Sequence, residues 1–495
     1  MQRRVSLALA AVALALLGAC TTVENPVTGR AERTVMDERS ELAEGRKAHD
    51  QVLAEYGAVP DARLQAYVNE VGQRLARHSH RAGLEWRFTV LDSPEVNAFA
   101  LPGGYIYVTR GILAYMDSEA DLAGVIGHEI GHVTARHGAQ RATRQQTAGL
   151  GVIAATILGA VLESRGMGGA GDLAQQVSQG VAAGYIARYS REQESQADQL
   201  GAEYLARTDE DPRHMVKVIQ MLVDQERFAA DQARAEGRAP SERPNWLASH
   251  PANEDRLRDV RAIVERYQGR YGDAGRERFL RAVDGLAFGE SREQGVTRGR
   301  QFFHEPLGIA LGAPPGWKIQ NGNEAIALVN GAGDAGLIVQ LVPPQAGATH
   351  EEILRKAVRA EQGRTERRSL NGLQATHFTG TRRNAQGQSQ PVELTIVTGP
   401  QERHFLLLHA AADAAALQRA RGGLAEAESS FRALTNADRA AARPWRLRTV
   451  PYPRGGFREL ARQSPLPDAE RQLRLVNGVY AGGEPAPGQL VKVVE

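Results

Sequence analysis

Two histidines four residues apart carry the clearest chemistry in this 495-residue sequence. Residues 127–132 read GHEIGH, so His128 and His132 flank Glu129 in an HExxH pattern. On a helix, residues four apart differ by about 40° in azimuth and about 6 Å in height, so both imidazoles converge on one point. Each can reach a zinc ion at about 2.0–2.1 Å, and Glu129 lies beside that ion, where it can act on a water molecule. The alternative is a helix whose two histidines only pack or form hydrogen bonds.

A third ligand must come from elsewhere in the chain, because a catalytic zinc has three protein ligands and an open fourth position. Residues 189–198 read YSREQESQAD, and on a helix Glu194 and Asp198 share one face. One carboxylate could bind the metal while the other accepts the free N–H of a ligand histidine. Alternatively, both carboxylates only pair with Arg188 or Arg191 on a solvated face.

Two helices are expected to position these side chains. The first begins at Ser118, which is a typical N-cap residue, and continues to about His137 with Asp121 in its first turn. Its apolar residues give it a buried side that would hold the histidines rigidly. The second helix covers about residues 182–208.

These motifs together resemble a known family. HEIGH, followed about 60 residues later by S-R-x-x-E-x-x-A-D, is similar to the zinc metallopeptidases of the HtpX, BepA and CAAX prenyl protease type, peptidase family M48, a gluzincin group. The resemblance covers about residues 35–285, including NAFALPGG at 97–104 and SHP at 249–251. It implies that His128, His132 and Glu194 bind one Zn²⁺ per chain. It also implies that Glu129 is the catalytic carboxylate and that Asp198 supports a ligand histidine.

His250, in the Ser-His-Pro tripeptide, has two functional roles open to it. It could donate a hydrogen bond to the oxyanion of the reaction, or it could occupy the fourth zinc position and hold the enzyme inactive. A lone histidine is more often structural, and this is the interpretation for His137, His214 and His377.

Short strands are predicted at 86–91, 98–101 and 105–109, where β-branched and aromatic residues are frequent. The strand at 105–109 is expected to lie beside the zinc helix. The resemblance implies an edge strand there that pairs with the backbone of an extended substrate. The alternative is an ordinary core hairpin.

The N-terminus has the layout of a secretory signal, with a basic start and an apolar run from Val5 to Leu17. It ends in LGAC, and Cys20 is the only cysteine, so the segment resembles a bacterial lipobox. This interpretation makes residues 1–19 a lipoprotein signal peptide, Cys20 the lipidated residue and residues 20–40 a tether. The resemblance to bacterial lipoproteins implies that Thr21 after the cysteine favours the outer membrane over retention at the inner membrane. The alternative is an ordinary signal peptide with a chance cysteine.

Composition excludes several classes of protein. With 60 Lys+Arg against 58 Asp+Glu, the chain lacks the basic surplus of a nucleic-acid binder, and one cysteine excludes a disulfide framework. The apolar run at 149–162 is too short to cross about 30 Å of hydrocarbon. It is predicted to be a buried helix or, with the glycine-rich loop at 165–171, a mobile hairpin over the cleft.

The expected fold class is α+β multidomain. A mainly helical gluzincin-type metalloprotease domain with a small sheet is expected at 41–288, and an α+β accessory domain at 301–437, with a polar linker at 289–299 and a helix at 350–362. Residues 445–495 are expected to form a third, small unit. Its GGFRELA, RLVNG and PGQLVK segments resemble a LysM module with the order strand, helix, helix, strand, although the usual G-D-T entry is absent.

These features predict a periplasmic zinc endopeptidase anchored to the outer membrane through lipid on Cys20. Its expected substrates are unfolded or misassembled envelope proteins, and no nucleic-acid partner is expected. One alternative is a chaperone-like or scaffolding lipoprotein with a latent protease site. Another is a tether to the cell wall, in which the C-terminal module binds peptidoglycan.

Overall fold

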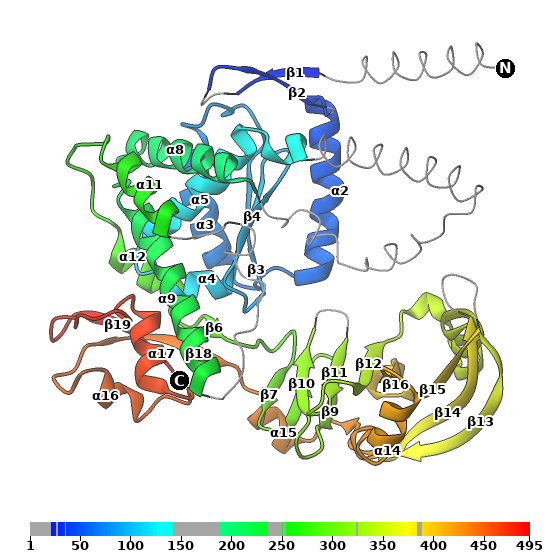
Figure 1. The fold of residues 1–495 in the computed structure, drawn as a ribbon. Coiled ribbons are helices and arrows are strands. Elements are labelled where there is room, and N and C mark those ends of the chain that lie inside the picture. The colour runs from blue at the N-terminus through cyan, green and yellow to red at the C-terminus, as the bar shows by residue number, and fades with distance from the viewer. Residues whose placement is uncertain are drawn as a thin grey trace, which may run out of the picture. The chain divides into compact units, whose positions relative to one another are not determined.

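The chain forms two compact units, which are described separately here. Unit 1 comprises Met1–Phe288 and Arg446–Glu495, and unit 2 comprises Gly289–Trp445 (Figure 1). The computed structural model describes residues 21–25, 28–34, 36–141, 189–235, 250, 254–322, 325–383 and 389–495. The predicted signal peptide, Cys20, the apolar run at 149–162 and the glycine-rich loop at 165–171 lie outside the described residues. Among the helices within them, none is long and apolar enough to cross a membrane.

Helix α5 (Glu119–Thr134) is the centre of unit 1, and every one of its residues is buried. Ser118 caps it as predicted, since its side chain accepts a hydrogen bond from the backbone N–H of Asp121. The helix packs against α3, α8 and α9. The described helices of unit 1 that precede residue 289 are α2 (Glu38–Tyr56), α3 (Ala62–Ala76), α4 (Arg110–Tyr115), α5, α8 (Arg191–Arg207), α9 (His214–Ala235), α11 (Glu254–Val264) and α12 (Arg276–Val283).

A three-stranded sheet lies against this helical core, with the order β3 (Arg87–Leu91), β5 (Tyr105–Thr109), β4 (Ala98–Leu101). Strand β3 is parallel to β5, and β4 is antiparallel to it. The expectation that residues 105–109 form an edge strand is therefore wrong, because both sides of β5 are already paired. The edge beside the central helix belongs to β4, which packs on α5.

An antiparallel hairpin occupies part of the predicted tether. Strands β1 (Thr21–Glu24) and β2 (Ala31–Thr34) pair along their whole length. Two hydrogen bonds close its turn. The backbone N–H of Asn25 donates to the carbonyl of Arg30, and the backbone N–H of Gly29 donates to the carbonyl of Asn25. Helix α2 begins four residues after β2, and the tether expected at residues 20–40 stays a prediction.

The C-terminal residues belong to unit 1 rather than to a third body. Strand β18 (Trp445–Pro451), α16 (Gly456–Ala461), α17 (Ala469–Val476) and β19 (Leu490–Val494) follow the predicted order of elements. However, β18 lies between β19 and β6 (Ala287–Phe288) in one sheet. The ammonium of Lys492 on β19 is fully buried and donates to the carbonyls of Ala114 and Met116 beside α4. The LysM-like interpretation stays a prediction.

Unit 2 is built on an antiparallel seven-stranded sheet with α14 (Ala414–Ser429) packed on β12 and β16. The strand order is β10 (Lys318–Asn321), β11 (Ile326–Val329), β12 (Ala335–Leu341), β16 (His404–Ala411), β15 (Ser389–Thr398), β14 (Leu373–Arg383) and β13 (Ala360–Leu370). A smaller sheet has the order β17 (Arg432–Ala433), β9 (Ile309–Gly312), β8 (Gln301–His304) and β7 (Val296–Arg298), and α15 (Asn436–Ala441) follows β17.

Two predictions in unit 2 are wrong. The helix expected at 350–362 consists of α13 (His350–Ile353) and one wider turn to Val358, after which Arg359 takes a left-handed conformation at φ 58°. Strand β13 follows. Nearly all of its residues are exposed, so the sequence there lacks the alternation of apolar and polar residues by which a strand is predicted. The predicted linker at 289–299 contains β7 and belongs to unit 2.

Lys492 should make the stability of unit 1 depend on pH. Burial lowers the pKa of its ammonium to about 8 from the ordinary 10.5. Between these two values the unfolded chain holds a proton that the folded chain lacks, so stability rises with pH across that window. We expect a rise on the order of 3 kcal/mol in the free energy of unfolding, measured by urea titration from pH 7.5 to 10.5. Lys492→Met should lack this rise, whereas parallel pH profiles for the two proteins would contradict the assignment.

Candidate metal centre

Helices α5 and α8 approach each other closely at glycines. A Cβ at Gly131 would lie 2.8 Å from the carbonyl oxygen of Ala197, and a Cβ at Gly201 would lie 3.1 Å from the backbone nitrogen of His128. Glycine inside a helix lowers the stability of the helix by about 1 kcal/mol relative to alanine. We infer that glycine occurs at these two positions because the close backbone contact leaves no room for a Cβ. The contact brings the acidic face of α8 up to the two histidines of α5.

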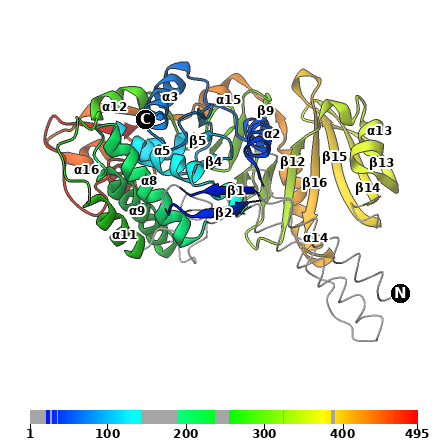
Figure 2. The same ribbon diagram turned by 90° about the horizontal axis from the view of Figure 1, so that it is seen from above.

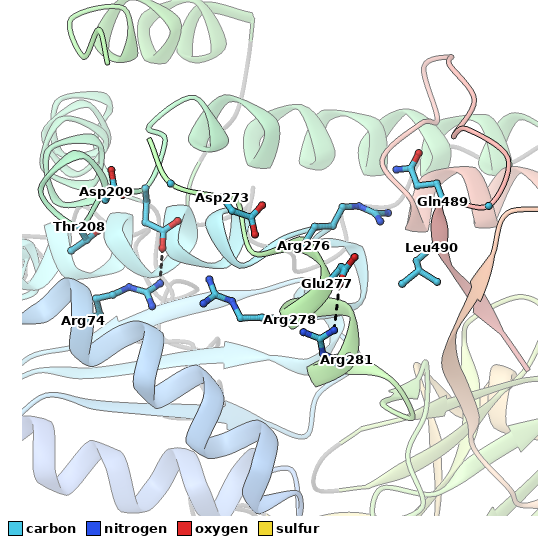
Figure 3. Close-up of a pocket in the computed structure, with 13 residues that line it drawn as sticks. Arg74, Thr208, Asp209, Asp273, Arg276, Glu277, Arg278, Arg281, Gln489 and Leu490 are labelled. Carbon is cyan, nitrogen blue, oxygen red and sulfur yellow. Dashed lines mark hydrogen bonds and ion pairs between the residues drawn. The ribbon is translucent and has the colours of Figure 1, made fainter. Parts of the chain in front are cut away.

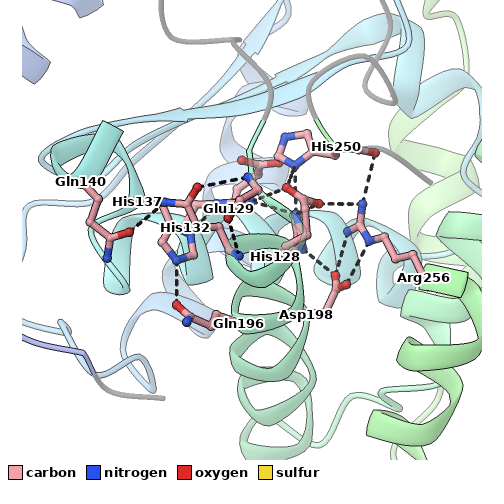
Figure 4. Close-up of polar contacts among 12 residues, drawn as sticks. His128, Glu129, His132, His137, Gln140, Gln196, Asp198, His250 and Arg256 are labelled. Carbon is pink, nitrogen blue, oxygen red and sulfur yellow. Dashed lines mark hydrogen bonds and ion pairs between the residues drawn. The ribbon is translucent and has the colours of Figure 1, made fainter. Parts of the chain in front are cut away.

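Four buried side chains converge where the two helices meet. One ligand atom from each of His128, His132, Glu194 and His250 lies within 4.8 Å of all the others (Figure 4). The Nε2 atoms of His128 and His132 are 3.0 Å apart. Nδ1 of His250 lies 3.2 Å from Nε2 of His128 and 2.9 Å from Oε1 of Glu194. The three residues predicted as zinc ligands are thus brought together, and His250 joins them.

The donor set and its spacing fit zinc. Asp198 Oδ1 lies 2.8 Å from Nδ1 of His128, so that nitrogen can donate and leave the lone pair of Nε2 for the cluster. Ligand atoms around a tetrahedral zinc lie about 3.3 Å apart, close to the separations found here. Imidazole nitrogens with one carboxylate oxygen are a preferred zinc environment. Asp198 has the supporting position that the sequence suggested.

Arg256 on α11 supports both carboxylates of α8. Its guanidinium lies 2.7 Å from Oε2 of Glu194 and makes hydrogen bonds of 2.8 and 3.0 Å to Asp198 (Figure 4). Burial favours the neutral acid, yet the charges of His250 and Arg256 hold the pKa of Glu194 well below its usual value. The same guanidinium and His128 lower the pKa of Asp198 against the effect of burial. Glu194 is therefore an anionic ligand candidate.

Glu129 is completely buried and lies next to the four ligand atoms without being one of them. Its Oε1 is 3.5 Å from Nε2 of His250, whose Nδ1 faces Glu194. Burial opposes the charged imidazolium, but Glu194 and Glu129 together raise the pKa of His250. His250 thus bridges the catalytic candidate and a ligand candidate.

Two further side chains contact His132, and the sequence analysis had not placed either in the site. The ring of Tyr189 stacks on the imidazole with a centroid distance of 3.9 Å. His137, which was interpreted as structural, has its Nδ1 2.8 Å from Nδ1 of His132. By contrast, His214 binds Asp121 near the start of α5, and His377 binds Thr395 in unit 2, as expected of structural histidines.

The cavity that borders His132 and Tyr189 is small, with a volume of about 10 Å³. That is room for about one water molecule. A cavity of about 880 Å³ lies elsewhere in unit 1, and none of the four ligand candidates or Glu129 lines it (Figure 3). Its lining includes arginines and acids that pair with one another, such as Arg74 with Glu210 and Arg281 with Glu277.

The four clustered residues lie in a segment that matches a known family. Residues 62–264 match the model of peptidase family M48. The chain is 29% identical over 240 residues to a beta-barrel assembly-enhancing protease of Yersinia pestis, covering 48% of this chain and 46% of that protein. It is 32% identical over 208 residues to the protein of the same name from Escherichia coli K12, covering 41% and 39%.

A eukaryotic relative matches the same part. The mitochondrial metalloendopeptidase OMA1 of Schizosaccharomyces pombe is 28% identical over 222 residues, covering 43% of this chain and 58% of that protein. The chain spans less than half of the length of the two bacterial relatives. The similarity thus concerns the domain that carries the metal cluster.

Replacing Gly131 by alanine should separate the two helices. The new Cβ would meet the Ala197 carbonyl, which is backbone and cannot turn away, and overpacking of this kind costs about 1–3 kcal/mol. We expect lower stability and weaker zinc binding, measured by urea unfolding and by competition with a zinc chelator. Gly124→Ala is the matched control on the same helix, because its Cβ would have 3.6 Å to the nearest atom and should stabilise the protein by about 1 kcal/mol. Equal zinc affinity in Gly131→Ala and Gly124→Ala would contradict the role of the close contact.

Proposed function

Residues 62–264 form a domain of peptidase family M48, and on this premise we propose that the chain is a zinc-dependent endopeptidase. The observation that carries the proposal is the buried cluster of His128, His132, Glu194 and His250 with Glu129 beside it. In the proposed enzyme, the first three residues hold one zinc ion. Two helices fix all three of these side chains, so the site is preorganised.

The proposed reaction is hydrolysis of a peptide bond. Zinc at this site supplies Lewis acidity, which polarises a carbonyl and lowers the pKa of a water molecule. Glu129 takes the proton of the attacking water as general base and delivers it to the leaving amine nitrogen as general acid. Asp198 and Arg256 keep the ligands oriented, since one accepts from His128 and the other holds Glu194.

His250 is proposed to occupy the fourth position of the metal and hold the site closed. Its Nδ1 lies among the ligand atoms, at 3.2 Å from Nε2 of His128 and 2.9 Å from Oε1 of Glu194. A peptide carbonyl must therefore displace this imidazole before reaction. We call this role of His250 a latch. Because Nδ1 of His250 lies among the ligand atoms, the arrangement favours the latch over the second role, in which the imidazole donates a hydrogen bond to the oxyanion.

The proposed substrates are unfolded or misassembled proteins of the bacterial envelope. The names of the bacterial relatives, which refer to β-barrel assembly, support this class. The lipobox-like sequence at Cys20 supports a periplasmic location with an outer-membrane anchor. Strand β4 is the edge available for pairing with an extended substrate beside α5. The position of His250 among the ligand atoms also supports the alternative of a chaperone-like or scaffolding protein whose protease site stays latent.

Glu129→Gln should abolish proteolysis and leave zinc binding intact, because Glu129 is not one of the clustered ligand atoms. Loss of general acid–base catalysis costs about 10²–10⁴-fold in rate. The measurement is cleavage of casein by the purified full chain and the variant, with zinc content quantified in both. Zinc in both proteins with measurable and equal cleavage would contradict the assignment of Glu129. Zinc in both with cleavage by neither would indicate a site held shut or a scaffold, and absence of zinc from both would contradict the metal site.

His250→Ala distinguishes the two roles of His250. If the imidazole is a latch, the rate of casein cleavage should rise while zinc remains bound by His128, His132 and Glu194. If it stabilises the oxyanion, the rate should fall by about 10²–10³-fold. A double variant with Glu129→Gln controls for a contaminating protease, since it should be inactive in both cases.

A further inference from the structure

A chain of buried hydrogen bonds connects the N-terminal hairpin with His132. Asn25, at the end of β1, donates from Nδ2 to Oε1 of Gln196 on α8 over 3.0 Å. In Figure 2 the hairpin lies beside that helix. Nε2 of His137 is 3.0 Å from the same Gln196 oxygen, and Nδ1 of His137 is 2.8 Å from Nδ1 of His132 (Figure 4). All four side chains are buried, so these bonds are shielded from bulk water.

The orientation of the Asn25 amide gives this chain a direction. The backbone N–H of Thr28 donates to Oδ1 of Asn25 over 3.2 Å. A backbone N–H is only a donor, so the atom facing it must be the amide oxygen, and the NH₂ group must face Gln196. An NH₂ group is also only a donor, so it requires the oxygen of Gln196. That oxygen in turn must accept from Nε2–H of His137.

The consequence reaches the metal cluster through the two imidazoles. In a neutral imidazole one nitrogen donates and the other accepts. With Nε2 of His137 donating to Gln196, its Nδ1 accepts from Nδ1–H of His132. Nε2 of His132 then carries a lone pair, and this is the atom that lies 3.0 Å from Nε2 of His128 in the cluster. A ligand histidine must present such a lone pair to the metal.

We propose that Asn25 sets the direction of this hydrogen-bond chain and so holds His132 in the tautomer that binds metal. Asn25, Gln196 and His137 are positioning residues that act through His132. The inference rests on the proposed zinc site and adds to it a control point in the hairpin that follows Cys20 in the sequence. Zinc affinity thereby depends on a residue that lies outside the two helices of the site.

One isosteric substitution can reverse the donor and acceptor roles along this chain of hydrogen bonds. In Asn25→Asp, one carboxylate oxygen still accepts from Thr28, but the other now faces Gln196 and needs a donor. The Gln196 amide would turn to present its NH₂ group, which also faces Nε2 of His137. That nitrogen becomes the acceptor, Nδ1–H of His137 donates to His132, and the proton of His132 moves to Nε2, where it blocks metal binding.

The test compares zinc affinities of the purified full chain and three variants by competition with a colorimetric chelator. Asn25→Asp should bind zinc about 10–100-fold more weakly, as is usual when outer hydrogen bonds of a metal ligand are lost. Asn25→Ala removes the bond without reversing the chain and should lose less. Gln196→Glu keeps an acceptor for both Asn25 and His137, so its affinity should be unchanged or tighter.

The melting temperatures of the metal-free proteins distinguish a positioning role from a purely structural one. If Asn25 only stabilised the fold, the melting temperature of each variant would fall in proportion to its loss of zinc affinity. Equal zinc affinity of the wild type and Asn25→Asp would overturn the inference while leaving the proposed enzyme intact. An affinity of Asn25→Asp above that of Asn25→Ala, or loss of affinity in Gln196→Glu, would also overturn it. Absence of zinc from the wild type would instead overturn the proposed function.

Discussion

The close contact between α5 and α8 is the constraint on which the rest of the site depends. Side-chain carbons are missing at Gly131 and Gly201, so the two backbones approach closely enough for short carboxylate side chains to reach imidazoles. Glu194 and Asp198 are one turn apart on α8, and His128 and His132 are one turn apart on α5. Two pairs with the same spacing thus meet across the contact, and Asp198 on α8 supports His128 on α5.

Charge explains why this buried cluster suits a divalent cation. Among the described residues of the cluster, the buried Glu129, Glu194 and Asp198 carry three formal negative charges against the one positive charge of Arg256, which leaves two negative charges. Burying unbalanced charge is costly, so the site is complete only when a cation enters it. His250, whose pKa is raised by the same carboxylates, can offset part of that charge when it bridges Glu194 and Glu129.

The ligand cluster could be predicted from the sequence because both HExxH and the acid pair have a spacing of four residues. On a helix this spacing places the two side chains of each pair on the same face. The sequence did not predict Arg256, His137 or Gln196, because a single arginine, histidine or glutamine on a helix carries no local pattern. Their roles come from contacts between segments that the chain separates widely. Strand β13 was missed for a different reason: its residues are exposed, so no hydrophobic alternation marks it. The position of β5 between two partners likewise depends on pairing that periodicity does not encode.

The insertion of unit 2 into unit 1 has a consequence for biosynthesis. Strands β6 and β18 are neighbours in one sheet, yet all of unit 2 is synthesised between them, and β19 with Lys492 follows later still. A chain that grows from its N-terminus has therefore made the whole metal cluster before it can complete the sheet beneath α4. Unit 1 finishes folding only after residues 490–494 have been synthesised, so a translation product truncated before them lacks a completed unit 1.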